Sequence, residues 1–278
     1  QQIIDIVKES GIIGMGGAGF PMYVKLMPKT AVDTVLLNGC ECEPLLTADH
    51  RLMLEYSDDI IFGLQAILKA VNAQKGIIVV EDNKPDAAQL LKEKTAGLEN
   101  IEVFVAKTKY PQGAEKMLIK NVTGRKVPNG GLPADVGCVV ANVSTSKAIS
   151  DAIQKGLPIT ERVVTVTGDR VRNPGNFMVK IGTSAKELLD YCGGVEGDAP
   201  YTVKIGGMMM GAVQNTLDVA TTKCSNGVAS SRSGYTAGLL GEGTIIITGG
   251  TFGFDPSNWV ADGYQAVKTG SVWVVSEI

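Results

Sequence analysis

The residues best suited to chemistry in this chain form a glycine-rich run, Gly11-Ile-Ile-Gly-Met-Gly-Gly-Ala-Gly-Phe-Pro21, with Lys25 shortly behind it. Because glycine lacks a Cβ, its backbone can take a positive φ and bring successive N–H groups against an anion. A helix that starts after the run, with Pro21 at its first position, adds the positive end of its dipole. Lys25 lies one turn beyond Pro21 on the same face of that helix. The run therefore predicts a loop that binds a phosphate group.

The spacing of Gly14, Gly16 and Gly19 matches the G-x-G-x-x-G pattern of dinucleotide folds, but that pattern requires a strand before the loop. The segment before this loop instead has apolar residues at helical spacing, namely Ile3, Ile4, Ile6 and Val7. We therefore predict a glycine loop between two helices. Two alternatives stay open: a tight connection that binds nothing, and a solvated surface position for Lys25.

Two carboxylates stand close together in Asn38-Gly-Cys-Glu-Cys-Glu-Pro44. Glu41 and Glu43 alternate along an extended segment, so both can face one side ahead of the turn at the proline. They repel each other unless they accept hydrogen bonds, and the hydroxyls of a ribityl chain or a ribose are suitable donors, with Asn38 able both to donate and to accept. The alternative is a solvated acidic loop.

Three further polar positions lie near expected helix starts. Glu115 follows Gly113, where a carboxylate either contacts a nucleotide or stabilises the helix dipole. Tyr110 offers an aromatic face that either stacks on a ligand or packs at the end of a strand. Asn142, followed by Thr145, has the pattern of a helix cap, and a cap and a phosphate contact share one geometry.

The cysteines and the single histidine do not form a recognisable metal or hydrolytic site. Cys40 and Cys42 are two residues apart, and no further cysteine or histidine lies close enough in the sequence to complete a zinc or iron–sulfur set. His50 also lacks the partners of a catalytic triad. We therefore predict no metal ligands and no catalytic side chain.

Composition excludes several classes of function. The chain has 278 residues, 44% of them hydrophobic, and a formal net charge of -3 with mixed signs, so no basic stripe offers itself to nucleic acid. No apolar run approaches the roughly 20 residues of a membrane span. Five scattered cysteines are too few for a disulfide framework and fit a reducing cytoplasm.

The first half of the chain alternates between strand and helix patterns. Expected strands are 34–38, 76–80 and 101–105, and expected helices are 60–71, 85–94 and a segment from Asn142 to about Gly156. This succession favours an α/β domain with a parallel sheet, in which ligands gather at the carboxyl ends of the strands.

The sequence pattern after Pro158 no longer alternates regularly between strand and helix. Strands are expected at 162–168, 177–181 and 201–205, with a helix opened by the capping box Ser184-Ala-Lys-Glu187, which is a small β-grasp pattern. We expect the small polar residues 225–233 to be a linker and the rest to be β-rich. The predicted organisation is therefore a nucleotide-binding domain at 1–157, a β-grasp domain at 158–223, and a linker with a β-rich tail of unassigned role at 224–278.

Four motifs resemble, in their order along the chain, the C subunit of Rnf-type electron transport complexes, which is related to the flavoprotein subunit of respiratory complex I. They are Gly14-Met-Gly-Gly-Ala-Gly-Phe-Pro21 with Lys25, Asn38-Gly-Cys-Glu-Cys-Glu-Pro44 with Thr47-Ala-Asp-His-Arg-Leu-Met53, Tyr110-Pro-Gln-Gly-Ala-Glu115, and Asn142-Val-Ser-Thr145. The resemblance implies a Rossmann-like domain that binds FMN and takes hydride from NADH, followed by a β-grasp domain of the soluble-ligand-binding (SLBB) type.

The resemblance also implies a set of cofactor-binding residues. They are Gly14, Gly16, Gly17, Ala18, Gly19, Phe20, Lys25, Asn38, Glu41, Glu43, Tyr110, Gly113, Glu115, Asn142 and Thr145. The hydride chemistry would belong to the cofactors themselves. The implied partners are the nicotinamide nucleotide and other subunits of a redox complex, through which the chain would sit at the cytoplasmic face of a membrane.

Three departures from the family pattern accompany the resemblance. Relatives carry cysteine motifs for two 4Fe-4S clusters, and no C-x-x-C-x-x-C run occurs here. Relatives have an additional β-rich domain ahead of the glycine loop, and Met208 stands where proline is usual in a glycine–methionine signature, Gly206 to Gly211, whose methionines we expect to pack against a neighbouring domain or subunit. Two alternative functions stay open: a flavin reductase that serves a corrinoid or amino-acid reductase, and a non-catalytic docking scaffold.

Overall fold

The computed structural model describes residues 1–197, 200–232, 250–252, 264–269 and 272–277. The chain divides into two compact units, Gln1–Tyr235 and Thr236–Ile278. Within the described residues, no helix has the length and apolar character needed to cross a bilayer.

A parallel sheet of four strands in the order β3-β2-β1-β4 forms the centre of the first domain. The strands are β1 (Thr34–Gly39), β2 (Lys75–Glu81), β3 (Ile101–Ala106) and β4 (Cys138–Asn142). The first three confirm the predicted strands, whereas β4 was not predicted. β1 and β2 are almost continuously apolar and buried, as expected for parallel strands that are covered on both faces.

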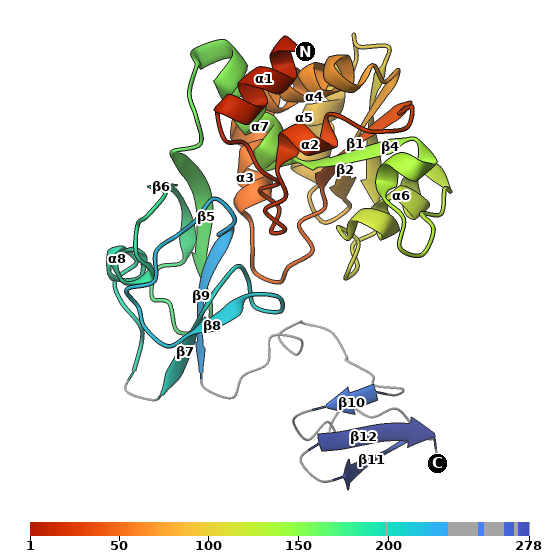
Figure 1. The fold of residues 1–278 in the computed structure, drawn as a ribbon. Coiled ribbons are helices and arrows are strands. Elements are labelled where there is room, and N and C mark those ends of the chain that lie inside the picture. Colours follow the sequence, from red (N-terminus) through yellow and green to blue (C-terminus); the bar gives the residue numbers. More distant parts are fainter. Residues whose placement is uncertain (198–199, 233–249, 253–263, 270–271, 278) are drawn as a thin grey trace. The chain divides into compact units, whose positions relative to one another are not determined.

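Helices cover both faces of this sheet (Figure 1). Alternate residues of β1 enter different cores: Val35 and Leu37 pack with one set of helices, and Leu36 packs with α6 on the other face. The first set comprises α1 (Gln2–Glu9), α3 (Ala48–Glu55), α4 (Ser57–Val71), α5 (Pro85–Thr95) and α7 (Val143–Lys155). The remaining helices are α2 (Met22–Lys25), α6 (Glu115–Thr123) and the short 3-10 turn η1 (Pro133–Val136). The predicted α/β class with a parallel sheet is confirmed.

The order of the strands creates a switch point at the carboxyl ends of β1 and β4. From β1 the chain proceeds to β2 and β3 on one side, and β4 then joins the opposite side of β1. Asn38 of β1 and Asn142 of β4 are partners in the register at this end. Open α/β sheets bind their ligands at such a point, where the two connecting loops part.

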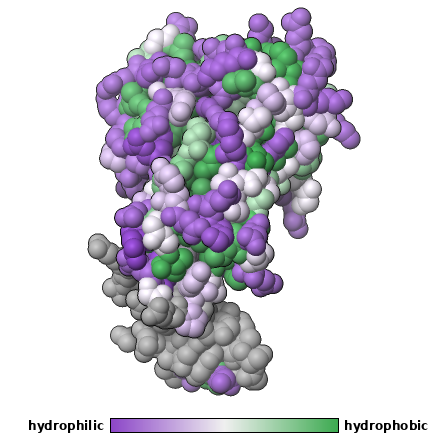
Figure 2. All heavy atoms as spheres, turned by 90° about the vertical axis from the view of Figure 1, so that its left-hand side faces the viewer, coloured by the Kyte–Doolittle hydropathy of each residue, from purple (hydrophilic) through white to green (hydrophobic). Residues whose placement is uncertain are grey.

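The second domain is a mixed five-stranded sheet in the order β6-β5-β9-β7-β8, packed on α8 (Ala185–Tyr191). Its strands are β5 (Glu161–Thr167), β6 (Gly175–Lys180), β7 (Tyr201–Ile205), β8 (Ala212–Gln214) and β9 (Gly227–Arg232). The predicted capping box is present, because Ser184 accepts from the Glu187 N–H and Glu187 accepts from the Ser184 N–H. On the face shown in Figure 2, hydrophilic and hydrophobic side chains are interspersed.

The predicted linker at 225–233 is wrong over Gly227–Arg232, which is β9. This strand pairs in parallel with β5 and antiparallel with β7 and lies in the middle of the sheet. Small side chains, which resemble a linker by composition, are required here by packing: Ser230 and Ser231 are fully buried, and a Cβ on Gly168 would lie 1.9 Å from the Ser230 carbonyl oxygen. The second domain therefore extends past residue 223.

The second unit contains a three-stranded antiparallel sheet in the order β10-β12-β11. Its strands are β10 (Gly250–Phe252), β11 (Tyr264–Thr269) and β12 (Val272–Glu277), which agrees with the β-rich prediction for the tail. The parts of the β-rich prediction that fall on residues 234–249 and 253–263 lie outside the described residues.

Gly63→Ala is expected to destabilise the first unit by about 1–3 kcal/mol, although alanine favours helices, because overpacking outweighs helix propensity. A Cβ at position 63 of α4 would lie 2.0 Å from the Ser146 carbonyl oxygen of α7. Urea unfolding measures the change. Gly97→Ala is the matched control, since a Cβ there meets nothing within 4 Å; equal unfolding free energies for the two variants would contradict the close contact between the helices.

Candidate functional site

The glycine loop joins α1 to α2, and hydrogen bonds hold its two ends together. Ile13 and Pro21 form an isolated β-bridge, and the Gly14 N–H donates to the Phe20 carbonyl oxygen at 2.8 Å. Gly19 N–H donates back to Gly14 at 3.1 Å, with Gly19 in the left-handed region at φ 64°. The prediction of a loop between two helices is confirmed.

Several N–H groups at the tip of the loop, between Gly16 and Phe20, have no hydrogen-bond acceptor in the described part of the protein. In the described part of the chain, no protein acceptor takes the N–H groups of Gly16, Gly17, Ala18 and Phe20. Unpaired N–H groups on adjacent residues are the donors that an anion requires. This arrangement is what the residue types predicted.

The helix whose N-terminus meets the loop is α7, not the helix that directly follows the loop. α2 is a single turn of four residues. The Met15 N–H instead donates to Thr145 Oγ1 at 2.9 Å, and a Cβ on Gly16 would lie 3.2 Å from the Cβ of Asn142. Asn142 is the cap of the 13-residue α7 and accepts from the Ser144 N–H at 2.8 Å. The long helix therefore brings its positive end to the loop.

A cavity of about 670 Å³ opens beside the loop at the carboxyl ends of β1 and β4. Its volume lies within the roughly 300–1,000 Å³ of small-molecule sites. The strand β4 supplies an apolar wall, Val139 to Ala141. Many of the predicted site residues line this cavity, namely Gly14, Gly16, Ala18, Phe20, Lys25, Asn38, Gly113, Glu115, Asn142 and Thr145.

Lys25 and Glu115 form an ion pair on the wall of this cavity. Lys25 Nζ lies 2.5 Å from Glu115 Oε1 and also donates to the Val140 carbonyl oxygen at 3.1 Å. The two side chains keep 28% and 36% of their surface exposed. The ammonium group is thus oriented by protein acceptors and still accessible from the cavity.

Asn38 holds the neighbouring loop in place. Its Nδ2 donates to the Gly113 carbonyl oxygen at 2.8 Å, and its Oδ1 accepts from the Cys40 N–H at 3.0 Å. A Cβ on Gly113 would lie 2.4 Å from the Cys40 carbonyl oxygen, so only glycine fits between the two loops. The amide of Asn38 is therefore occupied with backbone groups at the edge of the cavity.

Glu41, Glu43 and Tyr110 line a separate cavity of about 360 Å³, whereas Gly17 and Gly19 line neither of the two. Protein N–H groups donate to the carboxyl oxygens of both glutamates. Glu41 accepts from Asp49 and His50 N–H at 3.0 and 3.2 Å, at the start of α3. Glu43 accepts from the N–H groups of the turn before β8.

That turn is the predicted glycine–methionine signature. Met209 and Met210 donate their N–H groups to the two oxygens of Glu43 at 3.1 and 2.8 Å, while their side chains stay exposed. Met208 is fully buried, and a Cβ on Gly207 would lie 2.7 Å from Glu43 Oε2. The signature thus meets the first domain mainly through its backbone.

Burial shapes the titration of groups near the sheet end. Burial, with repulsion from the Asp49 carboxylate, raises the pKa of Glu41 to about 8. Burial likewise raises the pKa of the Cys40 thiol to about 12, with the Glu81 carboxylate adding to the effect, and burial raises the pKa of the Cys42 thiol. Both thiols therefore remain protonated near neutral pH.

Asp49 is a residue beside the site that was not among the predicted site residues. Its carboxylate accepts from Asn142 Nδ2 at 2.7 Å and from Ser144 Oγ at 2.6 Å, so it fixes the cap of α7. An acidic residue in the first turn of a helix normally indicates stabilisation of that helix alone. The signal was the pairing of this acid with the asparagine cap of another helix, which only the fold brings together.

The fold is that of an α/β domain with a parallel sheet, joined to a small β-grasp domain. Residues 7–151, over half of the chain, match the family described as the Nuo51 FMN-binding domain, and the chain belongs to that family. Residues 163–213 match the SLBB domain. Both agree with the resemblance found in the motifs.

Relatives with these domains are components of ion-translocating redox complexes. The C subunit of the proton-translocating ferredoxin:NAD(+) oxidoreductase complex of Clostridium ljungdahlii is 49% identical over 230 residues, which cover 82% of this chain and 50% of that protein. The corresponding component of the Na(+)-translocating complex of Acetobacterium woodii is 45% identical over 225 residues, with 80% and 51% covered. The chain thus spans about half the length of these curated relatives.

A solved structure shares the fold. An NAD+-reducing NiFe-hydrogenase in its air-oxidised state superimposes with a TM-score of 0.69 at 22% sequence identity, covering 83% of this chain and 46% of that chain. A likeness of this extent takes in both the α/β domain and the β-grasp domain.

The raised pKa of Glu41 predicts a pH-dependent stability. A carboxyl whose pKa is raised on folding stabilises the folded state below its unfolded pKa, and this contribution is lost as pH rises towards the folded pKa. The stability of the wild type relative to Glu41→Gln should therefore fall between about pH 5 and about pH 8. Thermal unfolding of both proteins across this range measures it, and a constant difference would contradict the raised pKa.

Proposed function

We propose that this chain is the flavin-bearing part of an electron-transfer complex, which binds FMN in the 670 Å³ cavity and accepts hydride from NADH. The observation that carries the proposal is the set of uncommitted amides on the glycine loop, placed beside the N-terminus of α7 and the ammonium group of Lys25. Membership of the FMN-binding family supports it.

The residues present fit a phosphate-bearing flavin. The amides of Gly16 and Ala18, which line the cavity, offer donors to the phosphate, and a side chain at Gly16 would fill the cradle against Asn142. Lys25 adds a positive charge on the wall of the same cavity. A phosphate held by backbone N–H groups and a helix N-terminus is a recurrent arrangement in nucleotide sites.

When bound, FMN supplies a ring that takes two electrons as a hydride and releases them singly. The protein's own residues orient and enclose it. Lys25 and Glu115 fix each other's position on one wall, and the apolar stretch Val139 to Ala141 excludes water on another. Asn38 keeps the Gly113 loop close to the cavity mouth. No side chain is assigned a proton transfer or a covalent step.

The partners follow from the relatives. Two of them are named as subunits of ion-translocating ferredoxin:NAD(+) oxidoreductase complexes. We therefore propose that this chain docks on other redox subunits at the cytoplasmic face of a membrane, with the nicotinamide nucleotide as its small-molecule substrate. The iron–sulfur clusters expected in full-length relatives would take the electrons onward.

Reconstitution with FMN tests the proposal directly. Folded protein titrated with FMN should quench the flavin fluorescence, and anaerobic addition of NADH should bleach the visible absorbance of the bound flavin. Absence of FMN uptake by folded protein would overturn the proposed function. Uptake without bleaching would retain the flavin site and remove NADH as the donor.

Lys25→Ala and Glu115→Ala are expected to stay folded and to bind FMN about tenfold or more weakly, because the first removes a positive charge from the cavity wall and the second removes the carboxylate that orients it. Fluorescence titration measures the affinity. Lys94→Ala is the control: it breaks an ion pair of the same 2.5 Å length, Lys94 with Asp58, away from the cavity lining. Wild-type affinity in both test variants would count against this pocket.

A further inference from the structure

Three residues of the β-grasp domain, Arg162, Lys223 and Cys224, contact the glycine loop. Lys223 Nζ donates to the Gly11 carbonyl oxygen at 2.7 Å, and a Cβ on Gly19 would lie 2.9 Å from Cys224 Sγ. Arg162, at the start of β5, donates from its two terminal nitrogens to the Met15 carbonyl oxygen at 3.5 and 3.4 Å. The start, middle and end of the loop are thus each held by the β-grasp domain.

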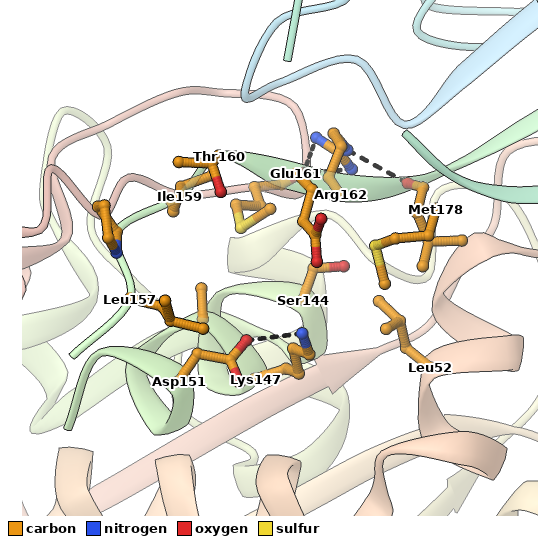
Figure 3. A pocket seen from close by; sticks show the side chains of 14 residues that line it. Leu52, Ser144, Lys147, Asp151, Leu157, Ile159, Thr160, Glu161, Arg162 and Met178 are labelled. Carbon is orange, nitrogen blue, oxygen red and sulfur yellow. Dashed lines mark hydrogen bonds and ion pairs between the residues drawn. The ribbon is translucent and has the colours of Figure 1, made fainter. Parts of the chain in front are cut away.

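Arg162 is a buried charge devoted to backbone acceptors. It is 3% exposed and donates also to the carbonyl oxygens of Lys223 and Val163. Burial lowers its pKa, and the nearby Asp49 carboxylate opposes that shift. Figure 3 shows Arg162 above a narrow cleft whose floor carries Ser144 and Lys147 of α7. Burying a charged guanidinium costs desolvation free energy, and this indicates that Arg162 serves to position the backbone groups to which it donates.

The geometry of the peptide bond defines that task. The Met15 carbonyl and the Gly16 N–H belong to one peptide unit, which is trans, so the two groups point in opposite directions. Because Arg162 draws the carbonyl towards the second domain, the Gly16 N–H is directed away from it. That N–H has no acceptor in the described part of the chain, and Gly16 lines the large cavity.

We propose that Arg162 and Lys223 are positioning residues of the β-grasp domain: Arg162 turns the Gly16 N–H towards the phosphate of FMN, and Lys223 anchors the start of the same loop at Gly11. The inference rests on the proposed function and deepens it. It assigns the second domain a role within the flavin site itself: its residues form the rear support of the phosphate loop without touching the cofactor.

Comparison of FMN with riboflavin isolates the phosphate contribution. Both ligands are titrated into the apoprotein of the full chain by fluorescence quenching. Arg162→Met should weaken FMN binding by about tenfold or more, from the loss of charge-assisted hydrogen bonds that orient the donor, and should leave riboflavin binding nearly unchanged. Arg162→Lys, which restores one cationic donor, should recover part of the preference for FMN.

A matched control separates positioning from domain stability. Val164→Ala lies two residues further along β5 in the core of the second domain, so it weakens that domain without removing a loop contact. It should keep the wild-type ratio of FMN to riboflavin affinity. If Arg162→Met does not fold, Lys223→Met carries the same expectation, because its side chain is only partly buried and holds a single carbonyl.

The outcomes are distinct. A wild-type preference for FMN over riboflavin in both Arg162→Met and Lys223→Met would overturn the inference while the proposed function stands. An equal loss of preference in Val164→Ala would overturn it as well, since the effect would then be one of stability. Failure of the wild type to take up FMN would overturn the proposed function and this inference together.

Discussion

An N–H group that donates to a phosphate oxygen is not available to hold its own loop in place through a hydrogen bond within the protein. This constraint governs the first domain. The N–H groups at the tip of the loop have no protein acceptor, so other atoms must fix the conformation of the loop. These are the β-bridge between Ile13 and Pro21, the hydroxyl of Thr145, and a side chain of the β-grasp domain that donates to a loop carbonyl oxygen. Most of what surrounds the loop can be understood as support for donors that the fold itself does not use.

The predictions that held were those with a local cause. Apolar runs identified the first three strands, a serine and a glutamate identified the cap of α8, and glycines beside a lysine identified the loop. The switch point was not predicted, because it depends on β4, whose Asn142 lies beside Asn38 of β1 only in the folded sheet. The order of the motifs, which resembles that of a known family, supplied the remaining candidate site residues, and these stay predictions.

The features that sequence reasoning missed depend on contacts between distant residues. The composition of β9 is typical of a linker because serine and glycine dominate it, yet its neighbours β5 and β7 demand small side chains. The hydrogen bonds to Glu43 from the N–H groups of a turn 166 and 167 residues away were not predicted either. Arg162 carries no motif at all, and its importance appears only when the loop carbonyl is seen beside it.

The central place of β9 bears on how the protein can be divided. A fragment ended at residue 223 would strip β5 and β7 of their shared partner and leave two bare strand edges, which recruit other chains. It would also lack Cys224, which packs on the turn at Gly19. Insolubility of such a shortened form would then reflect a severed sheet, and poor cofactor retention by it would be no measure of the pocket.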